Sequence, residues 1–178
     1  MDAMILPIQV LQSTSNATLI NSTLSGNSAA KGGGIYAYHP GTLTLTNATI
    51  SANTDTSYGG GGVWGNASIT VDNSIVAGNT QAGGPDLYPG FGAGSNNLMS
   101  GNPQLGSLGN NGGPTQTMLP QTGSAAINAA PCLAGIATDQ RGYIRPDPAS
   151  RSLTTPCDIG SVEANSISDE IFFNGFEP

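Results

Sequence analysis

The chain has 178 residues, which is enough for one domain with a hydrophobic core. Only 8% of the residues are charged, Lys and Arg together number 4, and glycine numbers 26, about twice its usual share. With a net charge of −7, the chain cannot form the cationic surface that binds nucleic acid, and no apolar run approaches the roughly 20 residues of a membrane helix. We therefore expect a polar but weakly charged β fold that works outside the cytoplasm.

The first residues do not resemble a secretory leader. Met1 to Gln12 has no basic start, and Pro7 interrupts its short apolar stretch. We expect residues 1–14 to be a truncated or capping coil, and the chain to be a fragment of a longer exported protein. An apolar edge left open at this end favours edge-to-edge self-association of the isolated chain.

A repeat dominates the first half of the chain. Segments 18–27, 44–53 and 70–79 superpose without gaps at a spacing of 26 residues. Each segment has, in order, an apolar residue, an Asn corner, a small residue, an outward side chain and a second apolar residue. A glycine-rich loop of variable length and a third short strand follow each segment. Since side chains alternate between the two faces of a strand, the third strands should carry these residues inward: Ile35, Val63 and Leu87.

The repeat predicts an all-β fold, a right-handed parallel β-helix (pectin-lyase-like solenoid) with three short strands per turn. It should have about 3–4 rungs of roughly 26 residues within 15–100. Asn suits the corners because it tolerates left-handed backbone geometry and can hydrogen-bond along a stack. From Gly101 the repeat dissolves, and residues 101–165 should form an irregular Pro/Gly-rich cap over the last rung. The predicted structural Asn ladder comprises Asn21, Asn47, Asn73, Asn27, Asn53 and Asn79.

Two groups of motifs resemble bacterial surface proteins. The rung sequence NSTLSGNSAAKGGGIY is similar to the β-helix repeats of polymorphic outer-membrane-type proteins. The stretches NPQLGSLGNNGGPTQTMLPQTGSAAINAA, TDQRGYIRP and CDIGSVE resemble the tail of the choice-of-anchor Q domain, and the two resemblances together cover roughly residues 15–163. They imply a fold and a location, extracellular or on the bacterial outer-membrane surface, rather than a reaction. The chain departs from the family pattern at four positions. The family is expected to have His, Pro, Asp and Gly where this chain has, in the same order, Met118, Ala125, Asn128 and Ala130.

The C-terminal part of the chain fits this location. Residues 166–178 resemble a sorting or anchoring signal of exported bacterial proteins. Cys132 and Cys157 lie 25 positions apart in the predicted cap, and a disulfide between them would contribute roughly 3 to 4 kcal/mol in an oxidising compartment. The alternative is two unpaired thiols. We expect no metal site, because His39 is the only histidine and lies in another region.

Catalysis is not expected from the acidic residues. Elimination needs a cationic base beside Ca²⁺, and glycoside hydrolysis needs two facing carboxylates. Asp55 in a loop, Asp72 before a corner Asn and Asp86 at the start of a third strand do not share a column. No cofactor is expected, and a polysaccharide lyase or hydrolase with its catalytic rungs upstream stays an alternative. Salt bridges and backbone capping account for the charged residues of the cap: Asp139, Arg141, Arg145 and Asp158.

The most informative exposed feature is aromatic. Tyr36, Trp64 and Tyr88 each follow the inward residue of a third strand, so they should point outward and form a column. Such a column can hold sugar rings, or it can stabilise the sheet surface by mutual stacking. We therefore expect a non-catalytic secreted or surface-displayed protein that acts as an adhesin or contacts a polysaccharide or cell-surface glycan. A purely structural spacer is the other alternative.

Regular threonines raise one further hypothesis. Outward threonines on a flat β face can order ice-like water, and two columns are present, Thr23 with Thr49 and Thr44 with Thr70. Ile75 interrupts the first column, and only three repeats are present. Ice binding is therefore the remotest of the functions considered.

Overall fold

The computed structural model describes residues 8–10, 16–38, 40–57, 59–81, 84–88, 93–145 and 156–164. Most of the predicted first coil, the predicted C-terminal tail at 166–178 and His39 lie outside the described residues. In the described part of the chain, all regular secondary structure consists of β-strands. The strands are β1 (Ile8–Val10), β2 (Ala17–Ile20), β3 (Thr23–Leu24), β4 (Ser28–Ala29), β5 (Ile35–Ala37), β6 (Thr42–Thr46), β7 (Thr49–Ile50), β8 (Thr54–Asp55), β9 (Val63–Gly65), β10 (Ser68–Asp72), β11 (Ile75–Val76) and β12 (Leu87–Tyr88).

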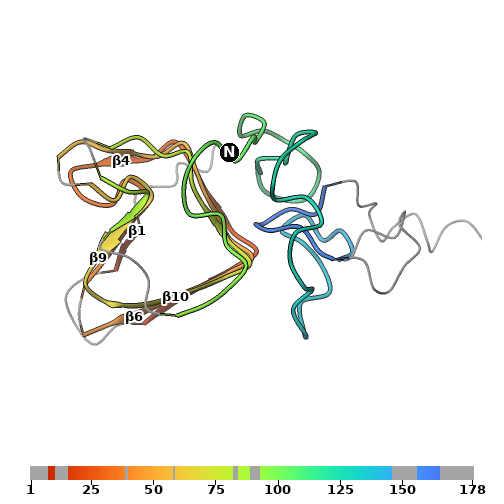
Figure 1. The fold of residues 1–178 in the computed structure, drawn as a ribbon, viewed down its shortest axis with the longest axis horizontal. Helices are drawn as coiled ribbons and strands as arrows, with labels where there is room; N and C mark the ends of the chain where they lie inside the picture. The colour runs from red at the N-terminus through yellow and green to blue at the C-terminus, as the bar shows by residue number, and fades with distance from the viewer. Residues whose placement is uncertain are drawn as a thin grey trace, which may run out of the picture.

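The strands pair in parallel, and the chain visits their sheets in a repeating order (Figure 1). One sheet has the order β1-β5-β9-β12, a second contains β2, β6 and β10, and a third contains β3, β7 and β11. This all-β arrangement of stacked parallel sheets agrees with the sequence prediction and is consistent with a β-helix-like solenoid. A fourth sheet, β4 with β8, was not predicted, and it places Asp55 in a strand rather than in a loop.

The 26-residue repeat is the pairing register of two sheets. Thr18 pairs with Thr44, and Thr44 pairs with Thr70. In the neighbouring sheet, Ile50 pairs with both Leu24 and Val76. The sheet that contains β5 keeps parallel pairing, with Val63 between Ile35 and Leu87, although the loops before its strands differ in length.

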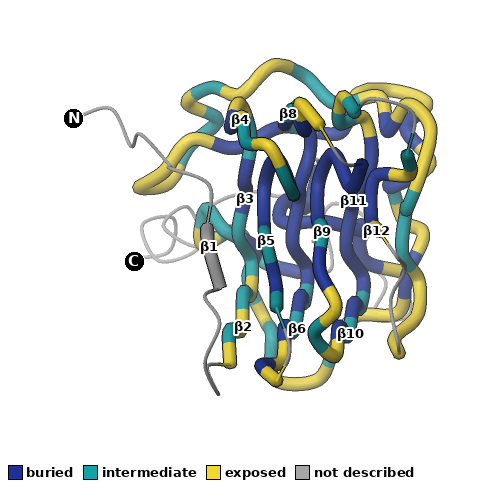
Figure 2. Tube along the Cα trace, turned by 90° about the vertical axis from the view of Figure 1, so that its left-hand side faces the viewer, coloured by how far each residue is buried: buried dark blue, intermediate teal, exposed yellow. Residues whose placement is uncertain are grey.

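The hydrophobic core lies inside the turns of the chain, where the strands are buried (Figure 2). In β6 and β10 every second residue is fully or almost fully buried, as alternation requires. Each such aliphatic side chain contributes about 1.5–3 kcal/mol by leaving water. The fully buried members include Ile35, Leu43, Leu45, Ile50, Val63, Val71 and Val76.

Asparagines make the corners between the second and third sheets. Asn21, Asn47 and Asn73 have φ angles of 46°, 46° and 47°, the left-handed region that Asn tolerates better than most residues. Asn96 has a φ of 56° and donates a side-chain hydrogen bond to Asn73 at 3.3 Å. A bridge between Leu98 and Ile75 continues the parallel pairing beyond β11.

The C-terminal segment packs beside the β3-β7-β11 sheet and not over the last turn, so that part of the sequence prediction is wrong (Figure 1). The Ser161 hydroxyl lies 2.7 Å from the Thr23 hydroxyl, and the Ser161 amide donates to Thr49 Oγ1 at 3.0 Å. Gly160 donates its amide to the Asn73 carbonyl at 2.8 Å, and a Cβ on Gly160 would meet Thr49 Oγ1 at 2.8 Å. The sheet face and the segment therefore fit through hydroxyl groups and a close backbone approach.

This docking changes the environment of one predicted outward column. Thr23, Thr49 and Ile75 are 4%, 1% and 1% exposed, although the sequence predicts that they face outward. Their side chains meet the C-terminal segment instead of water, because Ser161 satisfies the two hydroxyls and Gly160 leaves room for Ile75. Thr23 and Thr49 thus offer no surface for ordering ice-like water.

Candidate functional site

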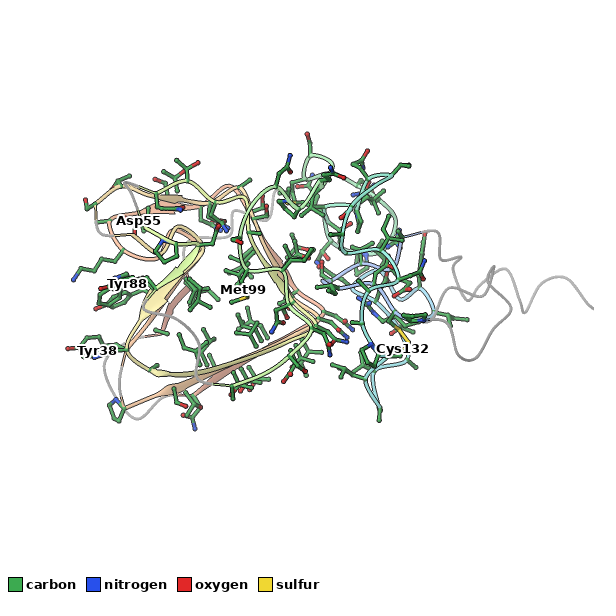
Figure 3. The ribbon with its side chains drawn as sticks, viewed as in Figure 1. Tyr38, Asp55, Tyr88, Met99 and Cys132 are labelled. Atoms are coloured by element: carbon green, nitrogen blue, oxygen red, sulfur yellow. A yellow bond between two sulfur atoms is a disulfide. The ribbon has the colours of Figure 1, made fainter. Side chains whose placement is uncertain are left out.

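The three predicted aromatic residues form one stack on the outer side of the sheet. Tyr36 on β5 pairs with Trp64 on β9, which pairs with Tyr88 on β12. The ring centroids of Tyr36 and Trp64 are 5.1 Å apart with 14° between their planes, and those of Trp64 and Tyr88 are 6.5 Å apart with 23°. Tyr38 extends the group, with its ring 6.1 Å from that of Tyr36 (Figure 3). We call Tyr36, Trp64 and Tyr88 the aromatic column.

The ring orientation limits how the aromatic column can bind a ligand. Because neighbouring rings are nearly parallel, their faces turn toward one another along the stack, and each pair contributes about 0.5–1.5 kcal/mol beyond area burial. Tyr36 and Trp64 are half-buried, whereas Tyr88 at one end is 44% exposed. A sugar therefore meets the end and the outer edge of the column rather than three separate ring faces.

A shallow depression adjoins Tyr36, on the strand β5 that pairs with β1 as well as with β9. It has a volume of about 230 Å³ and is lined by Ala29, Ala30, Lys31 and Tyr36. The Lys31 ammonium lies 4.9 Å from the centroid of the Trp64 ring, within the range of a cation–π contact. The sequence reasoning did not single out Lys31 for this site, because Lys31 lies in a loop outside the repeating columns.

The acidic residues of the repeats accept hydrogen bonds from backbone amides. Asp55 is 2% exposed and accepts hydrogen bonds from the amides of Gly32 at 3.0 Å and Ser57 at 2.8 Å. Asp72 accepts the Ser95 amide at 3.0 Å. Asp86 accepts the backbone and side-chain amides of Asn79, both at 2.8 Å. Each of these three carboxylates therefore accepts amide hydrogen bonds that fix a different loop of the fold.

The six asparagines of the predicted ladder divide into two groups. Asn27 donates its backbone and side-chain amides to Asn53 Oδ1, at 3.1 and 3.0 Å. Asn53 donates in the same way to Asn79 Oδ1, at 3.0 and 2.9 Å, and Asp86 accepts from Asn79 at the end of the series. These residues form a continuous amide chain inside the fold.

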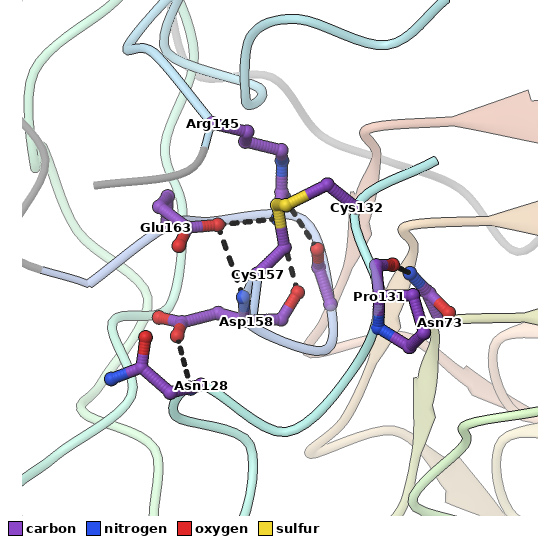
Figure 4. The surroundings of a disulfide bond; sticks show 9 residues. Asn73, Asn128, Pro131, Cys132, Arg145, Cys157, Asp158 and Glu163 are labelled. Carbon is purple, nitrogen blue, oxygen red and sulfur yellow. Dashed lines mark hydrogen bonds and ion pairs between the residues drawn. A yellow bond between two sulfur atoms is a disulfide. The ribbon is translucent and has the colours of Figure 1, made fainter. Parts of the chain in front are cut away.

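The corner asparagines use their side chains differently. Asn21 donates its side-chain amide to the Thr138 carbonyl at 2.8 Å, and Asn73 donates to the Pro131 carbonyl at 2.7 Å (Figure 4). Asn47 lies between them and is 2% exposed. The Nδ2 atoms of Asn21 and Asn73 therefore bind the C-terminal cap, while Asn73 Oδ1 accepts a hydrogen bond along the corner from Asn96.

Cys132 and Cys157 form the disulfide that the sequence predicts, in the cap (Figure 4). The backbone of Cys157 also pairs with Ala130 in an antiparallel bridge. The disulfide therefore joins the start of the docked segment 156–164 to a strand-like stretch of the cap. This link keeps Ser161 and Gly160 close to the β3-β7-β11 sheet.

Two ion pairs organise the charged residues of the cap. Arg141 binds Asp139 at 2.8 Å, and Arg145 binds Glu163 at 2.9 Å. Arg145 also donates to the carbonyls of Asp158 at 3.0 Å and Gly160 at 2.6 Å (Figure 4). The carboxylate of Asp139 accepts the backbone amides of Arg141 and Glu163 as well. Salt bridging and backbone capping thus describe this cluster.

Burial has opposite effects on the two partners of the second ion pair. Desolvation, together with the nearby Asp158 carboxylate, raises the pKa of Glu163 to about 7, against the opposing effect of Arg145. Desolvation lowers the pKa of Arg145, against the attraction of Glu163, Asp139 and Asp158. The folded protein therefore binds a proton at Glu163 more readily than the unfolded chain does.

The Glu163 shift predicts a pH-dependent stability. Its pKa is about 7 in the folded state against an ordinary 4.5, so its contribution to stability is complete at low pH and decreases as the pH rises to about 7. Glu163→Gln, which does not titrate, should show a flatter decrease of unfolding free energy between about pH 5 and about pH 8. Urea denaturation over this range measures both slopes. Parallel pH profiles for the two proteins would contradict the shift.

The part of the chain that the structure describes contains no helix with the length and apolar character needed to cross a membrane. No protein-family model matches the chain, and no curated protein or solved structure is significantly similar to it.

Proposed function

We propose that the chain is a non-catalytic, right-handed parallel β-helix of the pectin-lyase-like kind, with about 3–4 turns of roughly 26 residues. The parallel register at the repeat spacing supports this proposal, as do the left-handed Asn corners. The disulfide and the weakly charged composition support a secreted or bacterial surface location, because disulfides persist in oxidising compartments. The resemblance of the cap to the choice-of-anchor Q domain points to the same location.

The proposed role is contact with a glycan, as an adhesin, through the aromatic column. The observation that carries this proposal is the position of Tyr88, 44% exposed at the end of a stack of aromatic rings. Aromatic rings bind the apolar faces of sugars, and their polar edges remain in water. Tyr88 is the ring on which a pyranose can stack, and Trp64 holds Tyr88 in place from behind.

Replacement of Tyr88 tests this role. Tyr88→Ala should weaken binding to a responsive polysaccharide by at least about fivefold, equivalent to about 1 kcal/mol, while Tyr88→Phe retains most of the binding. Affinity electrophoresis in gels that contain soluble bacterial or plant polysaccharides measures the effect. The matched control is Leu108→Ala, which removes another exposed apolar side chain, 38% exposed, from the cap. Equal retardation of Tyr88→Ala and the wild-type protein would contradict the proposal.

A structural spacer is the second candidate, and one observation favours it. The small angle of 14° between the Tyr36 and Trp64 rings is the geometry of mutual stabilisation. A spacer would show no retardation by any polysaccharide, and Tyr88→Ala would change only the free energy of unfolding. The electrophoresis experiment therefore separates the two candidates.

A further inference from the structure

We propose that the depression beside Tyr36 is a subsite for an anionic sugar ring, a uronate or a sulfated pyranose, whose charged group binds Lys31. This inference rests on the glycan contact proposed above and specifies the class of ligand. The depression lies beside Tyr36, on the strand β5 that also pairs with β1. A glycan chain that also reaches Tyr88 would contact both the depression and the exposed end of the column.

The size and lining of the depression suit one sugar ring. Its volume of about 230 Å³ is below the roughly 300–1,000 Å³ of pockets for drug-sized ligands. Ala29 and Ala30 provide small apolar surfaces, and Tyr36 provides an aromatic one. Such surfaces match the apolar C–H face of a pyranose, while the hydroxyl rim of the sugar remains in water.

Lys31 supplies the charge that selects an anion. It is the only lysine of the chain, and the three arginines lie at position 141 or later, in a protein with a net charge of −7. One cation beside an aromatic stack is therefore the feature of this face that can attract an acidic ligand. The Trp64 ring lies 4.9 Å from the ammonium and favours its position beside the aromatic column.

A buried carboxylate fixes the loop that carries Lys31. Asp55 is 2% exposed and accepts the backbone amide of Gly32, the residue after Lys31. Its oxygens accept the amides of Gly32 at 3.0 Å, Ser57 at 2.8 Å and Gly59 at 3.3 Å. These donors offset the negative charge of Asp55, and its bond to Gly32 fixes the backbone next to Lys31.

The aromatic column connects the depression beside Tyr36 with the exposed ring of Tyr88. Successive rings of the aromatic column lie on strands that are about 4.8 Å apart in a parallel sheet. A linear polysaccharide seated at Tyr36 can therefore extend across Trp64 to Tyr88. This arrangement predicts stronger binding of oligomers than of single sugars.

Charge-changing variants test the inference. The probes are polygalacturonate, which carries carboxylates, dextran sulfate, which carries sulfates, and neutral dextran, and binding is measured by calorimetry at low and high salt. Lys31→Gln should weaken binding of at least one anionic probe about tenfold or more, and Lys31→Arg should restore it to within about threefold. The matched control is Ser68→Asp, which changes the net charge equally at an exposed position on β10 and should have little effect.

The outcomes separate this inference from the proposed function. Response to polygalacturonate alone identifies a carboxylate ligand, and response to dextran sulfate alone identifies a sulfate ligand; either supports the subsite. The subsite proposal is wrong if Lys31→Gln binds the anionic probes as tightly as the wild-type protein does. It is also wrong if Lys31→Gln and Ser68→Asp have the same affinity for these probes. Retained binding of a neutral glycan that Tyr88→Ala weakens would then leave the proposed function standing. If no glycan binds at all, both proposals fail.

Discussion

Replacing Asn53 with alanine should lower the free energy of unfolding by about 3–5 kcal/mol, the largest effect that we expect from a single substitution. Asn53 is 0% exposed and lies in the middle of the amide chain. Its Oδ1 accepts two hydrogen bonds from Asn27, and its Nδ2 donates to the Leu24 carbonyl at 2.9 Å and to Asn79 Oδ1 at 2.9 Å. Alanine leaves several buried polar groups without their partner, at about 1–3 kcal/mol for each group.

Urea denaturation followed by circular dichroism measures this loss. The control is Gln116→Ala, which removes a side-chain amide at an exposed position and should change the free energy by less than about 0.5 kcal/mol. A loss below about 1 kcal/mol for Asn53→Ala would show that water replaces these hydrogen bonds. The amide chain would then not be a main source of stability.

Removing the disulfide should lower the free energy of unfolding by about 3.5 kcal/mol, the second largest effect. Cys132 and Cys157 close a loop with a sequence separation of 25, and the entropy of the unfolded chain rises when such a link is lost. The change should act first on the cap, because the link holds segment 156–164 beside the β3-β7-β11 sheet. The Ser161 amide, which donates to Thr49 Oγ1 at 3.0 Å, should therefore lose protection early.

The variant for this test carries Cys132→Ala and Cys157→Ala together. Hydrogen exchange should accelerate at Ser161 and Gly160 before it accelerates at Val71 in β10, since Val71 belongs to the core of the repeats. Dithiothreitol should have the same effect on the wild-type protein and none on the double variant. Uniform acceleration across cap and repeats would contradict the account, because it would mean that the two parts unfold together.

Much of the fold could be predicted from the sequence because the repeat is also the pairing register. A spacing of 26 residues pairs Thr44 with Thr70 and places Asn47 and Asn73 at equivalent corners. The β4 and β8 pair was missed because two-residue strands are too short to produce a periodic pattern. Strand alternation predicted inward and outward positions, but it could not reveal what covers an outward side chain.

The position of the cap could not be predicted for a physical reason. The face that it covers contains Thr23 and Thr49, whose hydroxyls suggest exposure to water. Their partner, Ser161, is 112 residues away from Thr49, and no local pattern indicates this contact. The contacts of the Asn21 and Asn73 amides with the cap are also long-range in the sequence, so no local pattern indicates them. The sequence predicts a ladder at the corner instead.

The candidate site was predictable only in part. Alternation within the third strands predicted that Tyr36, Trp64 and Tyr88 point outward. The orientation of their ring planes depends on packing between strands and could not be predicted. Lys31 lies in a loop outside the repeat, so its contact with Trp64 appears only in three dimensions. The glycan role of these residues stays a prediction.

The fluorescence of Trp64 tests the central claim most directly. It is the only tryptophan of the chain, and its ring contacts those of Tyr36 and Tyr88. Titration with polysaccharides should produce a saturable change in its emission, and in a folded Tyr88→Ala variant the half-saturation concentration should be at least about fivefold higher. Emission that is already blue-shifted and does not change with any polysaccharide would contradict the account, and the aromatic column would then be packed structure in a spacer.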